Sequence, residues 1–226
     1  MPRPVEHECH FEPVAHAYLD CHGRRWRSVT QTLTETGCVD LSMVDPETLA
    51  LAAERGRRVH ELSAQWDRIR TRMRLTDMFA RFKVPESLHG YLYQYERFLI
   101  ETGFVAIPHE TERPRLVQIH GRLVGMTPDR VGHFPGSRRL VVLDLKTGVY
   151  MLSHPLQLAG YSLGLESVMR LAMLHERIAL YLTPESYRMQ PYPHQQDYYA
   201  FLDALNDGAE GYLATWKHHR QRKLIA

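Results

Sequence analysis

The sequence predicts an α/β domain of the mixed α+β kind, in which a small central mixed sheet is flanked by helices. After Pro85, apolar residues recur at the i, i+3, i+4, i+7 spacing of a helix. After Gly103 the period changes, and short alternating segments separated by turn residues are typical of strands. A further helical segment then precedes one more apolar strand. The resulting order of helices, three strands, helix, strand and helix favours a sheet covered by helices.

The N-terminal third is expected to hold a hairpin and one long helix. Alternating segments within residues 9–30 are separated by a turn at Asp20–Gly23. Asp45 is a good N-cap, Pro46 suits the first helical position, and Glu47 lies in the first turn. We expect this helix to continue to about Arg74, with Gly56 as the point where it could break.

The remaining elements follow from periodicity and from turn residues. In chain order we expect a helix from Pro85 to Gly103, strands over Phe104–Glu110, Arg122–His133 and Leu140–Lys146, a helix from Pro155 to about Met173, a strand over Arg177–Leu182, and a helix from about His194 to Trp216.

The 226 residues contain no low-complexity linker and no internal repeat, which favours one domain. We divide it into an N-terminal hairpin elaboration (1–44), a helical part with His60 (45–103), a core (104–183), and a C-terminal helix with a basic tail (184–226).

Composition excludes several classes. Hydrophobic residues make up 44% and charged residues 24%, as in globular proteins, which excludes disordered and fibrous chains. No apolar run is long enough to cross a membrane, and residues 1–10 lack an apolar signal segment. Three cysteines, all within the first 40 residues, argue against a disulfide framework. We therefore expect a cytoplasmic protein.

The positive charges are almost all arginine, since only four of the 28 basic residues are lysine. Base composition of the coding DNA is one explanation. The other is phosphate contact, because a planar guanidinium binds phosphate through two hydrogen bonds. The bases concentrate in two segments, Arg55–Lys83 and the tail from Lys217, which makes nucleic acid a candidate partner.

The clearest chemical signal lies in the predicted strands. Asp144 and Lys146 are two residues apart and therefore leave the same strand face, whereas Leu143 and Leu145 point into the core. Asp129 lies 15 residues earlier, where a hairpin pairing would bring its carboxylate beside Asp144. Two such carboxylates suit Mg²⁺ or Mn²⁺, and a neighbouring lysine can hold a water or stabilise charge on a phosphate. The alternative is a surface salt bridge from Asp144 to Lys146 or Arg139.

Together with their neighbours, these residues resemble the PD-(D/E)XK nuclease superfamily, and most closely its RecB-type and phage-type exonuclease branch. The matching motifs occur in the expected order and span roughly His60 to Tyr161: Gly56-Arg-Arg-Val-His60, Glu110 or Glu112, Asp129, Asp144-Leu-Lys146, and Gln157-Leu-Ala-Gly-Tyr161. The resemblance implies a restriction-endonuclease-like core with the element order αβββαβ.

The resemblance also implies a role for each matching residue. His60, Glu110, Asp129, Asp144 and the Leu145 carbonyl would hold the metal. Lys146 would orient the attacking water, and Gln157 with Tyr161 would border the site. Counting along the first strand favours Glu110 over Glu112.

Each assignment has a structural alternative. His60 could be an ordinary helix residue, Glu110 and Glu112 could be exposed strand carboxylates, and Gln157 could simply hydrogen-bond Tyr161. Some relatives carry four cysteines for an iron–sulfur cluster, and with three cysteines we expect none here.

The function implied is Mg²⁺-dependent or Mn²⁺-dependent hydrolysis of DNA by a two-metal mechanism, by an exonuclease acting at DNA ends in phage DNA recombination or repair. Binding would be to the DNA backbone and independent of sequence. The alternatives are an inactive DNA-binding module and a nuclease subunit that needs a helicase or annealing partner. Endonuclease action and the oligomeric state stay open.

Overall fold

The computed structural model describes residues 6–13, 15–39, 43–169, 176–208 and 210–225, and the side chains of this range up to residue 220. The predicted helix end near Met173 therefore lies outside the described residues. Within them, no helix is long and apolar enough to cross a membrane.

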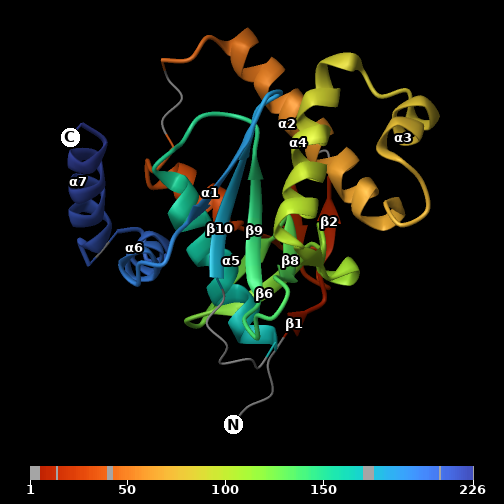
Figure 1. Ribbon diagram of the computed structural model, residues 1–226. Helices are drawn as coiled ribbons and strands as arrows, with labels where there is room; N and C mark the ends of the chain where they lie inside the picture. The colour runs from red at the N-terminus through yellow and green to blue at the C-terminus, as the bar shows by residue number, and fades with distance from the viewer. Residues whose placement is uncertain (1–5, 14, 40–42, 170–175, 209, 226) are drawn as a thin grey trace.

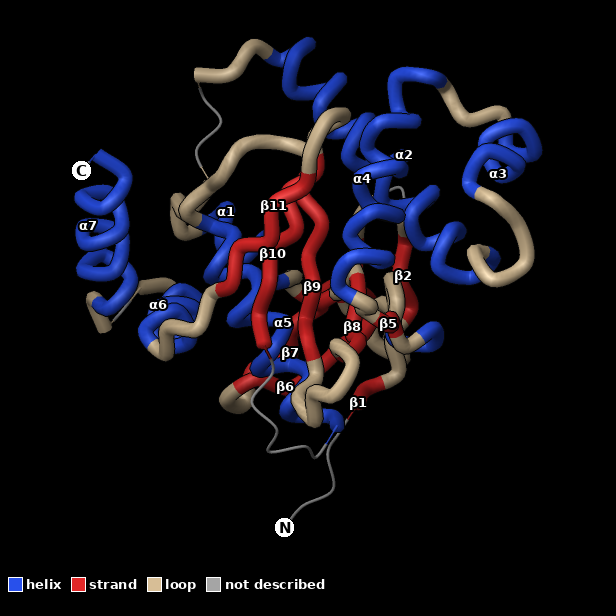
Figure 2. The backbone as a smooth tube through the Cα atoms, viewed as in Figure 1, coloured by secondary structure: helices blue, strands red, loops and turns tan. Residues whose placement is uncertain are grey.

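A five-stranded mixed sheet forms the centre of the molecule (Figures 1 and 2). Its strand order is β11-β10-β9-β8-β5, and only β9 and β10 are parallel. Its strands are β5 (Val105–Ala106), β8 (Arg130–His133), β9 (Val141–Lys146), β10 (Glu176–Leu182) and β11 (Tyr187–Pro191). The crossover between the two parallel strands contains α5 (Ser153–Met169). The predicted mixed α+β class is confirmed.

Helices cover both faces of this sheet. Because side chains alternate along β9, successive residues of that strand identify which helices lie on each face. Leu143 and Leu145 pack into an apolar cluster with α2 (Pro46–Ile69) and α4 (Glu86–Thr102), whereas Val142 packs into a second cluster with α5. The α2 and α4 helices therefore lie on one face of β9, and α5 lies on the other.

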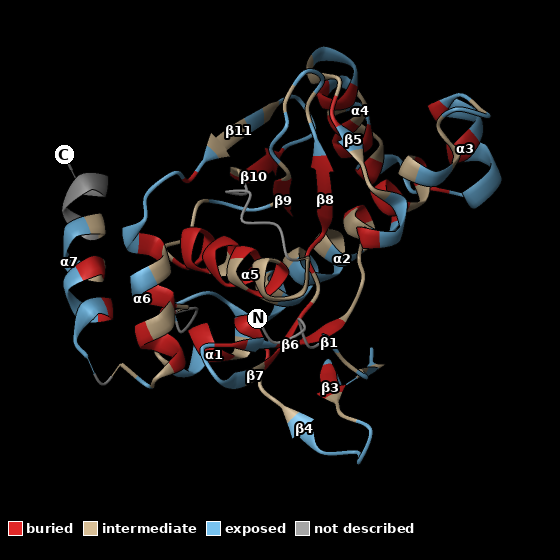
Figure 3. Ribbon diagram, turned by 90° about the horizontal axis from the view of Figure 1, so that it is seen from below, coloured by how far each residue is buried: buried red, intermediate tan, exposed pale blue. Residues whose placement is uncertain are grey.

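The α5 helix is enclosed on two sides by sheets. A second sheet, β1 (Glu6–His7), β6 (Arg115–Ile119) and β7 (Arg122–Met126), packs on its other side, as seen from below in Figure 3. Residues around the whole circumference of α5 are consequently buried, which explains why it is apolar with little polar face.

The predicted N-terminal hairpin is present as a third sheet, made of β2 (His10–Glu12), β3 (Ala17–Leu19) and β4 (Arg25–Trp26). The Asp20–Gly23 turn joins β3 to β4, and the Asp20 carboxylate accepts hydrogen bonds from the backbone N–H groups of His22 and Arg24. All three cysteines are free thiols.

The α2 and α4 helices both begin as predicted, but only α4 also ends as predicted. Asp45 caps α2 by accepting a hydrogen bond from the Thr48 N–H at 2.8 Å, and α2 continues through Gly56 without a break. It ends at Ile69 rather than Arg74, and α3 (Leu75–Phe82), which was not predicted, follows. Gly103 ends α4 in the left-handed region, with φ of 67°.

Three predicted elements are wrong in extent. The strand expected over Phe104–Glu110 is only β5, because Pro108 starts a short 3₁₀ helix, η1 (Pro108–Glu110). The segment 122–133 divides into β7 and β8, which belong to different sheets, at Thr127-Pro128. The C-terminal helix divides into α6 (Gln196–Leu205) and α7 (Tyr212–Ile225), between which Gly208 and Gly211 both have φ of 75°.

The structure also contains elements that were not predicted. Strands β6 and β11 and the short helix α1 (Val29–Glu35) are additional to the sequence interpretation. Ser28 caps α1 through a reciprocal capping box with Gln31.

The hairpin is fixed to the core by a close approach at Gly125. A β-carbon added there would lie 2.2 Å from the Tyr18 ring, so Gly125→Ala must displace that ring. We expect the variant to lower the free energy of unfolding by about 1–3 kcal/mol. In Gly56→Ala the new β-carbon would meet only the Thr147 hydroxyl at 3.5 Å, and improved helix propensity should stabilise by up to about 1 kcal/mol. Urea unfolding of both variants tests the difference, and equal effects would contradict it.

Candidate metal centre

Two buried carboxylates meet between β8 and β9. The two strands are antiparallel with Arg130 opposite Leu143, and continuing this register places Asp129 opposite Asp144. Both side chains are buried, and the Leu145 N–H donates a hydrogen bond to Asp129 Oδ2 at 2.6 Å. The pairing expected from the sequence is therefore present.

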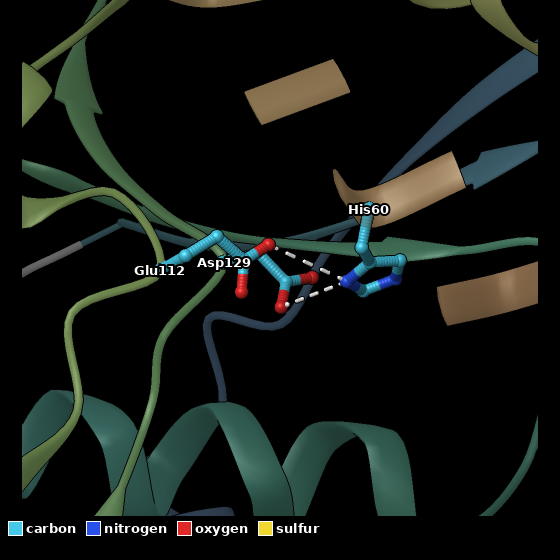
Figure 4. A group of neighbouring side chains, drawn as sticks. All are labelled: His60, Glu112 and Asp129. Atoms are coloured by element: carbon cyan, nitrogen blue, oxygen red, sulfur yellow. Dashed lines mark ion pairs between the residues drawn. The ribbon is translucent and has the colours of Figure 1, made fainter. Parts of the chain in front are cut away.

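His60 reaches this pair from α2. Its Nε2 lies 3.0 Å from the Leu145 carbonyl oxygen, and its Nδ1 lies 3.2 Å from Asp129 Oδ1 and 3.6 Å from Glu112 Oε1 (Figure 4). All these partners are acceptors, so these contacts favour the ring protonated on both nitrogens. Burial alone would lower the pKa of His60, but the Asp129 carboxylate, followed by Glu112, outweighs it and raises the pKa to about 10.

The structure brings Glu112, and not Glu110, to His60. Glu110 is buried in η1, where it forms ion pairs with Arg115 and, at 3.4 Å, with Arg113. Counting along a continuous strand favoured Glu110, but the turn at Pro108 removes that register. Glu112 instead adopts a left-handed backbone with φ of 50°, and its N–H donates to the Asp129 carbonyl at 3.2 Å.

Lys146 connects the carboxylates to α5. Its Nζ lies 2.6 Å from Asp144 Oδ2 and donates to Gln157 Oε1 at 2.9 Å. The Gln157 side-chain amide in turn donates to the Tyr161 hydroxyl at 2.9 Å. Gln157 and Tyr161 thus bond each other, as in the structural alternative, and Gln157 also contacts the lysine that the motif identifies.

The two aspartates have opposite electrostatic surroundings. Burial raises the pKa of Asp144 to about 6, and the negative charge of Asp129 adds to this although Lys146 opposes it. Burial acts in the same direction on Asp129, but the charge and hydrogen bond of His60 outweigh it, so the pKa of Asp129 is lowered. Asp129 is therefore the more firmly ionised carboxylate.

The donor set fits a divalent cation. One ligand atom each from His60, Glu112 and Asp129 lies within 4.8 Å of the other two, while Asp144 lies outside this group. Carboxylate oxygens with an imidazole nitrogen and a nearby backbone carbonyl suit Mg²⁺ or Mn²⁺. The His60 imidazolium now supplies the positive charge between these acceptors, so His60 must lose a proton before it can act as a ligand.

The group opens into a cleft of about 730 Å³. The cleft is lined by α2 residues, including Arg57 and Arg68, by the α5 residues Gln157 and Tyr161, and by the N-terminal hairpin. Gly56, the first residue of the Gly-x-x-x-His motif, lines the same cleft. The predicted residues from four separate segments therefore share one cavity.

Arg130 holds two residues of the centre, Glu112 and Asp129, through hydrogen bonds. It was not identified from the sequence. Its side chain is 0% exposed and donates to Asp67 at 2.5 Å, to Ser63 Oγ at 2.9 Å, to Glu112 at 3.2 Å and to the Asp129 carbonyl at 2.7 Å. A signal was available, because a charged residue directly after Asp129 begins an otherwise apolar strand. Nothing in the sequence identified Asp67 as its partner.

Comparison with models of known protein families and with curated proteins found no match to this chain. The resemblance to nucleases therefore depends on the order of the motifs in the sequence.

Arg130→Met should destabilise the fold by about 3–5 kcal/mol, because it leaves the Asp67 carboxylate without its buried partner. The matched control is Arg139→Met, since the Arg139 side chain is 61% exposed and lies 4.0 Å from its partner Glu176. That control should change stability by less than about 1 kcal/mol. Urea unfolding measures both, and a small effect of Arg130→Met would contradict the assigned role.

The stability of the metal-free protein should fall as the pH rises above neutrality. The folded-state pKa of His60, about 10, lies above its ordinary value of 6.5, so folding favours the charged form. Its contribution is complete below pH 6.5 and is lost as the pH rises through 10. Urea unfolding in EDTA from pH 7 upward should show this slope, and His60→Gln should reduce it. Identical slopes in both proteins would exclude a charged His60.

Proposed function

We propose that this chain is a metal-dependent deoxyribonuclease of the PD-(D/E)XK type that acts as an exonuclease at DNA ends. The observation that carries the proposal is the convergence of His60, Glu112 and Asp129 beside the Asp144–Lys146 ion pair. Acidic clusters and Asp–Lys pairs are each common alone. Their proximity at Asp129, in the motif order of a known nuclease superfamily, is much more specific.

The order of elements around the site supports the same proposal. Along the chain, α4, β5, β8, β9, α5 and β10 follow the αβββαβ order of a restriction-endonuclease-like core, with β6 and β7 inserted after β5. Asp129 immediately precedes the second of these strands, β8, and Asp144 lies in the third, β9. Gln157 lies in the helix that follows, α5.

The residues divide the chemistry of phosphodiester hydrolysis between them. His60, Glu112 and Asp129 would hold the cation, with Asp144 as a further carboxylate opposite Asp129. The Leu145 carbonyl, expected from the sequence to be a ligand, instead contacts the other ring nitrogen of His60 and would orient the imidazole. A cation bound there would polarise the phosphate and lower the pKa of a bound water. The Lys146 ammonium would orient the attacking water and stabilise negative charge on the phosphate oxygens.

Neighbouring side chains hold Lys146 in place for that role. Asp144 and Gln157 contact its ammonium at 2.6 Å and 2.9 Å, and Tyr161 fixes Gln157. Because Tyr161 accepts from the Gln157 amide group, the Gln157 carbonyl oxygen is directed at the lysine. This ordered chain reduces the conformational freedom of the ammonium beside the reacting phosphate.

Arginines at the mouth of the cleft would bind the DNA backbone. Arg57 lines the cleft and forms ion pairs with Glu54 and Glu61, all with side chains at least 45% exposed. Exposed pairs contribute little to stability, so Arg57 can exchange these partners for phosphate. Arg68 lines the same cleft, and binding through both should be independent of sequence and weakened by salt.

The direct test uses purified protein with Mg²⁺ or Mn²⁺ and three substrates: linear duplex DNA, linear single strands and closed circles, each with an EDTA control. Metal-dependent loss of linear DNA with circles spared is the expected result, and cutting of circles would make the protein an endonuclease. Salt-sensitive binding without any cleavage would overturn the proposed activity in favour of an inactive DNA-binding module or a subunit lacking its partner.

Lys146→Ala should reduce the cleavage rate by at least about 10²–10³-fold, because it removes the positive charge beside the phosphate. Binding of linear DNA in EDTA should change little. Arg122→Ala is the charge control, since Arg122 is exposed on β7 outside the cleft. Lys146→Met serves as a second variant that retains the aliphatic stem, and circular dichroism establishes that each protein is folded. Undiminished cleavage by a folded Lys146 variant would remove this residue from the mechanism.

A further inference from the structure

A second cavity, of about 440 Å³, lies between α6 and α7 and shares no lining residue with the metal cleft. Figures 1 and 3 place these helices at the end of the molecule far from α3. We call this cavity the α6–α7 groove. Its principal lining residues are three aromatic side chains, two imidazoles and a guanidinium: Tyr199, Tyr212, Trp216, His194, His219 and Arg220.

The groove exposes aromatic surface that the fold does not use. Tyr199 is 52% exposed and Tyr212 is 56% exposed, and their ring centroids lie 6.2 Å apart with an interplanar angle of 32°. Trp216 is only 7% exposed, and its indole N–H donates to Asp197 at 2.9 Å. The two tyrosine rings are therefore about half exposed beside a buried tryptophan, and their exposed faces form a surface on which a planar group can stack.

The charge around the groove suits an anion. None of its lining residues is acidic. Asp197 lies fully buried beneath it, and its carboxylate is bonded to Arg177 at 3.4 Å and to Arg220 at 3.0 Å. The described side chains of α7, from Tyr212 to Arg220, include Lys217 and Arg220 and no acid. The groove lining therefore presents a permanent cation, Arg220, and no acidic side chain.

We infer that the α6–α7 groove binds single-stranded nucleic acid, with bases stacked on Tyr199 and Tyr212 and the backbone phosphates near His219 and Arg220. A planar ring with an attached phosphate is the ligand that both features of the groove recognise together. Stacking accepts any base, because every base has a π-face, and the cations track the backbone. Binding of this kind is independent of sequence.

The groove is a contact separate from the metal centre, because α5 lies between them. Gln157 and Tyr161 on α5 line the metal cleft, whereas Gly160 packs against Phe201 of α6. A strand held in the groove is therefore not the segment whose phosphate is at the metal centre. The inference extends the proposed function by adding a second contact for DNA, and it does not need the metal centre to be active.

The test measures binding of fluorescein-labelled (dT)20 by the full-length protein in EDTA, by fluorescence anisotropy at low salt. Tyr199→Ala/Tyr212→Ala should weaken binding at least tenfold, and Tyr199→Phe/Tyr212→Phe, which keeps both rings, should retain it. Quenching of tryptophan fluorescence by the strand, lost in Trp216→Phe, provides a second readout at the groove itself.

Three outcomes would overturn the inference. The first is unchanged affinity for (dT)20 in the double-alanine variant. The second is equally tight binding of dTMP, which would make the ligand a free nucleotide and not a strand. The third is a dimer, detected by sedimentation, that the double-alanine substitution dissociates without any effect on (dT)20, which would make the groove an interface between two copies.

Failure of the proposed nuclease activity remains distinguishable from failure of this inference. Cleavage is measured with Lys146→Ala in the presence of metal, and groove binding is measured in EDTA with the tyrosine variants. Binding of (dT)20 through the tyrosines without any cleavage would support the groove inference and contradict the proposed nuclease activity. Cleavage of DNA together with unchanged (dT)20 binding in the double-alanine variant would support the nuclease activity and contradict the groove inference.

Discussion

The buried guanidinium of Arg130 is the constraint on which the centre of this molecule depends. Its partners come from α2, from the loop with Glu112 and from its own strand, and its guanidinium carbon lies 5.6 Å from the centroid of the Tyr95 ring on α4. A charge without solvent needs such partners, so Arg130 links these elements to one another. That arrangement holds Glu112 in its left-handed backbone and directs its carboxylate at His60. The geometry of the candidate metal centre is thus set by a residue that would not itself touch a metal.

The second determinant is the position of α5 between two sheets. A helix enclosed in this way has little surface in contact with solvent, so its buried polar residues must bond to partners inside the protein. Gln157 does so with Lys146 and with Tyr161. These contacts of Gln157 lie at the end of β9, where the sheet supplies a charged side chain. Packing and chemistry coincide here because the cation that Gln157 reaches is Lys146.

Much of the centre was predictable because it depends on local spacing. Asp129, Asp144 and Lys146 are close in sequence and lie on paired strands, so alternation and one hairpin register place them together. The choice between Glu110 and Glu112 was not predictable in this way, since it depends on a turn at Pro108 and on a positive φ. Arg130 was missed for a related reason, because its importance comes from Asp67, which is 63 residues away.

The same distinction applies to the fold. Caps at Asp45 and Gly103 are signalled by single residues and were predicted correctly. Strand β6 lies beside β7 in a small sheet whose existence depends on packing against α5, and no local pattern reports such packing. The division of the last helix depended on glycines whose conformations only the tertiary structure fixes. Prediction therefore succeeded where the signal lies within a few residues and failed where distant segments decide.

The contacts that close the metal centre differ greatly in chain separation, and this affects how the protein folds. Asp129 bonds Leu145 across 16 residues, whereas His60 bonds the same residue across 85. Short loops close at a smaller entropic cost, so the β8–β9 pair can form before α2 docks on it. The carboxylates then lie together before the imidazole arrives to offset their charge. A cation that binds only the completed centre would stabilise the docking of α2 on the sheet. The same ion would then contribute to the stability of the fold as well as to the reaction.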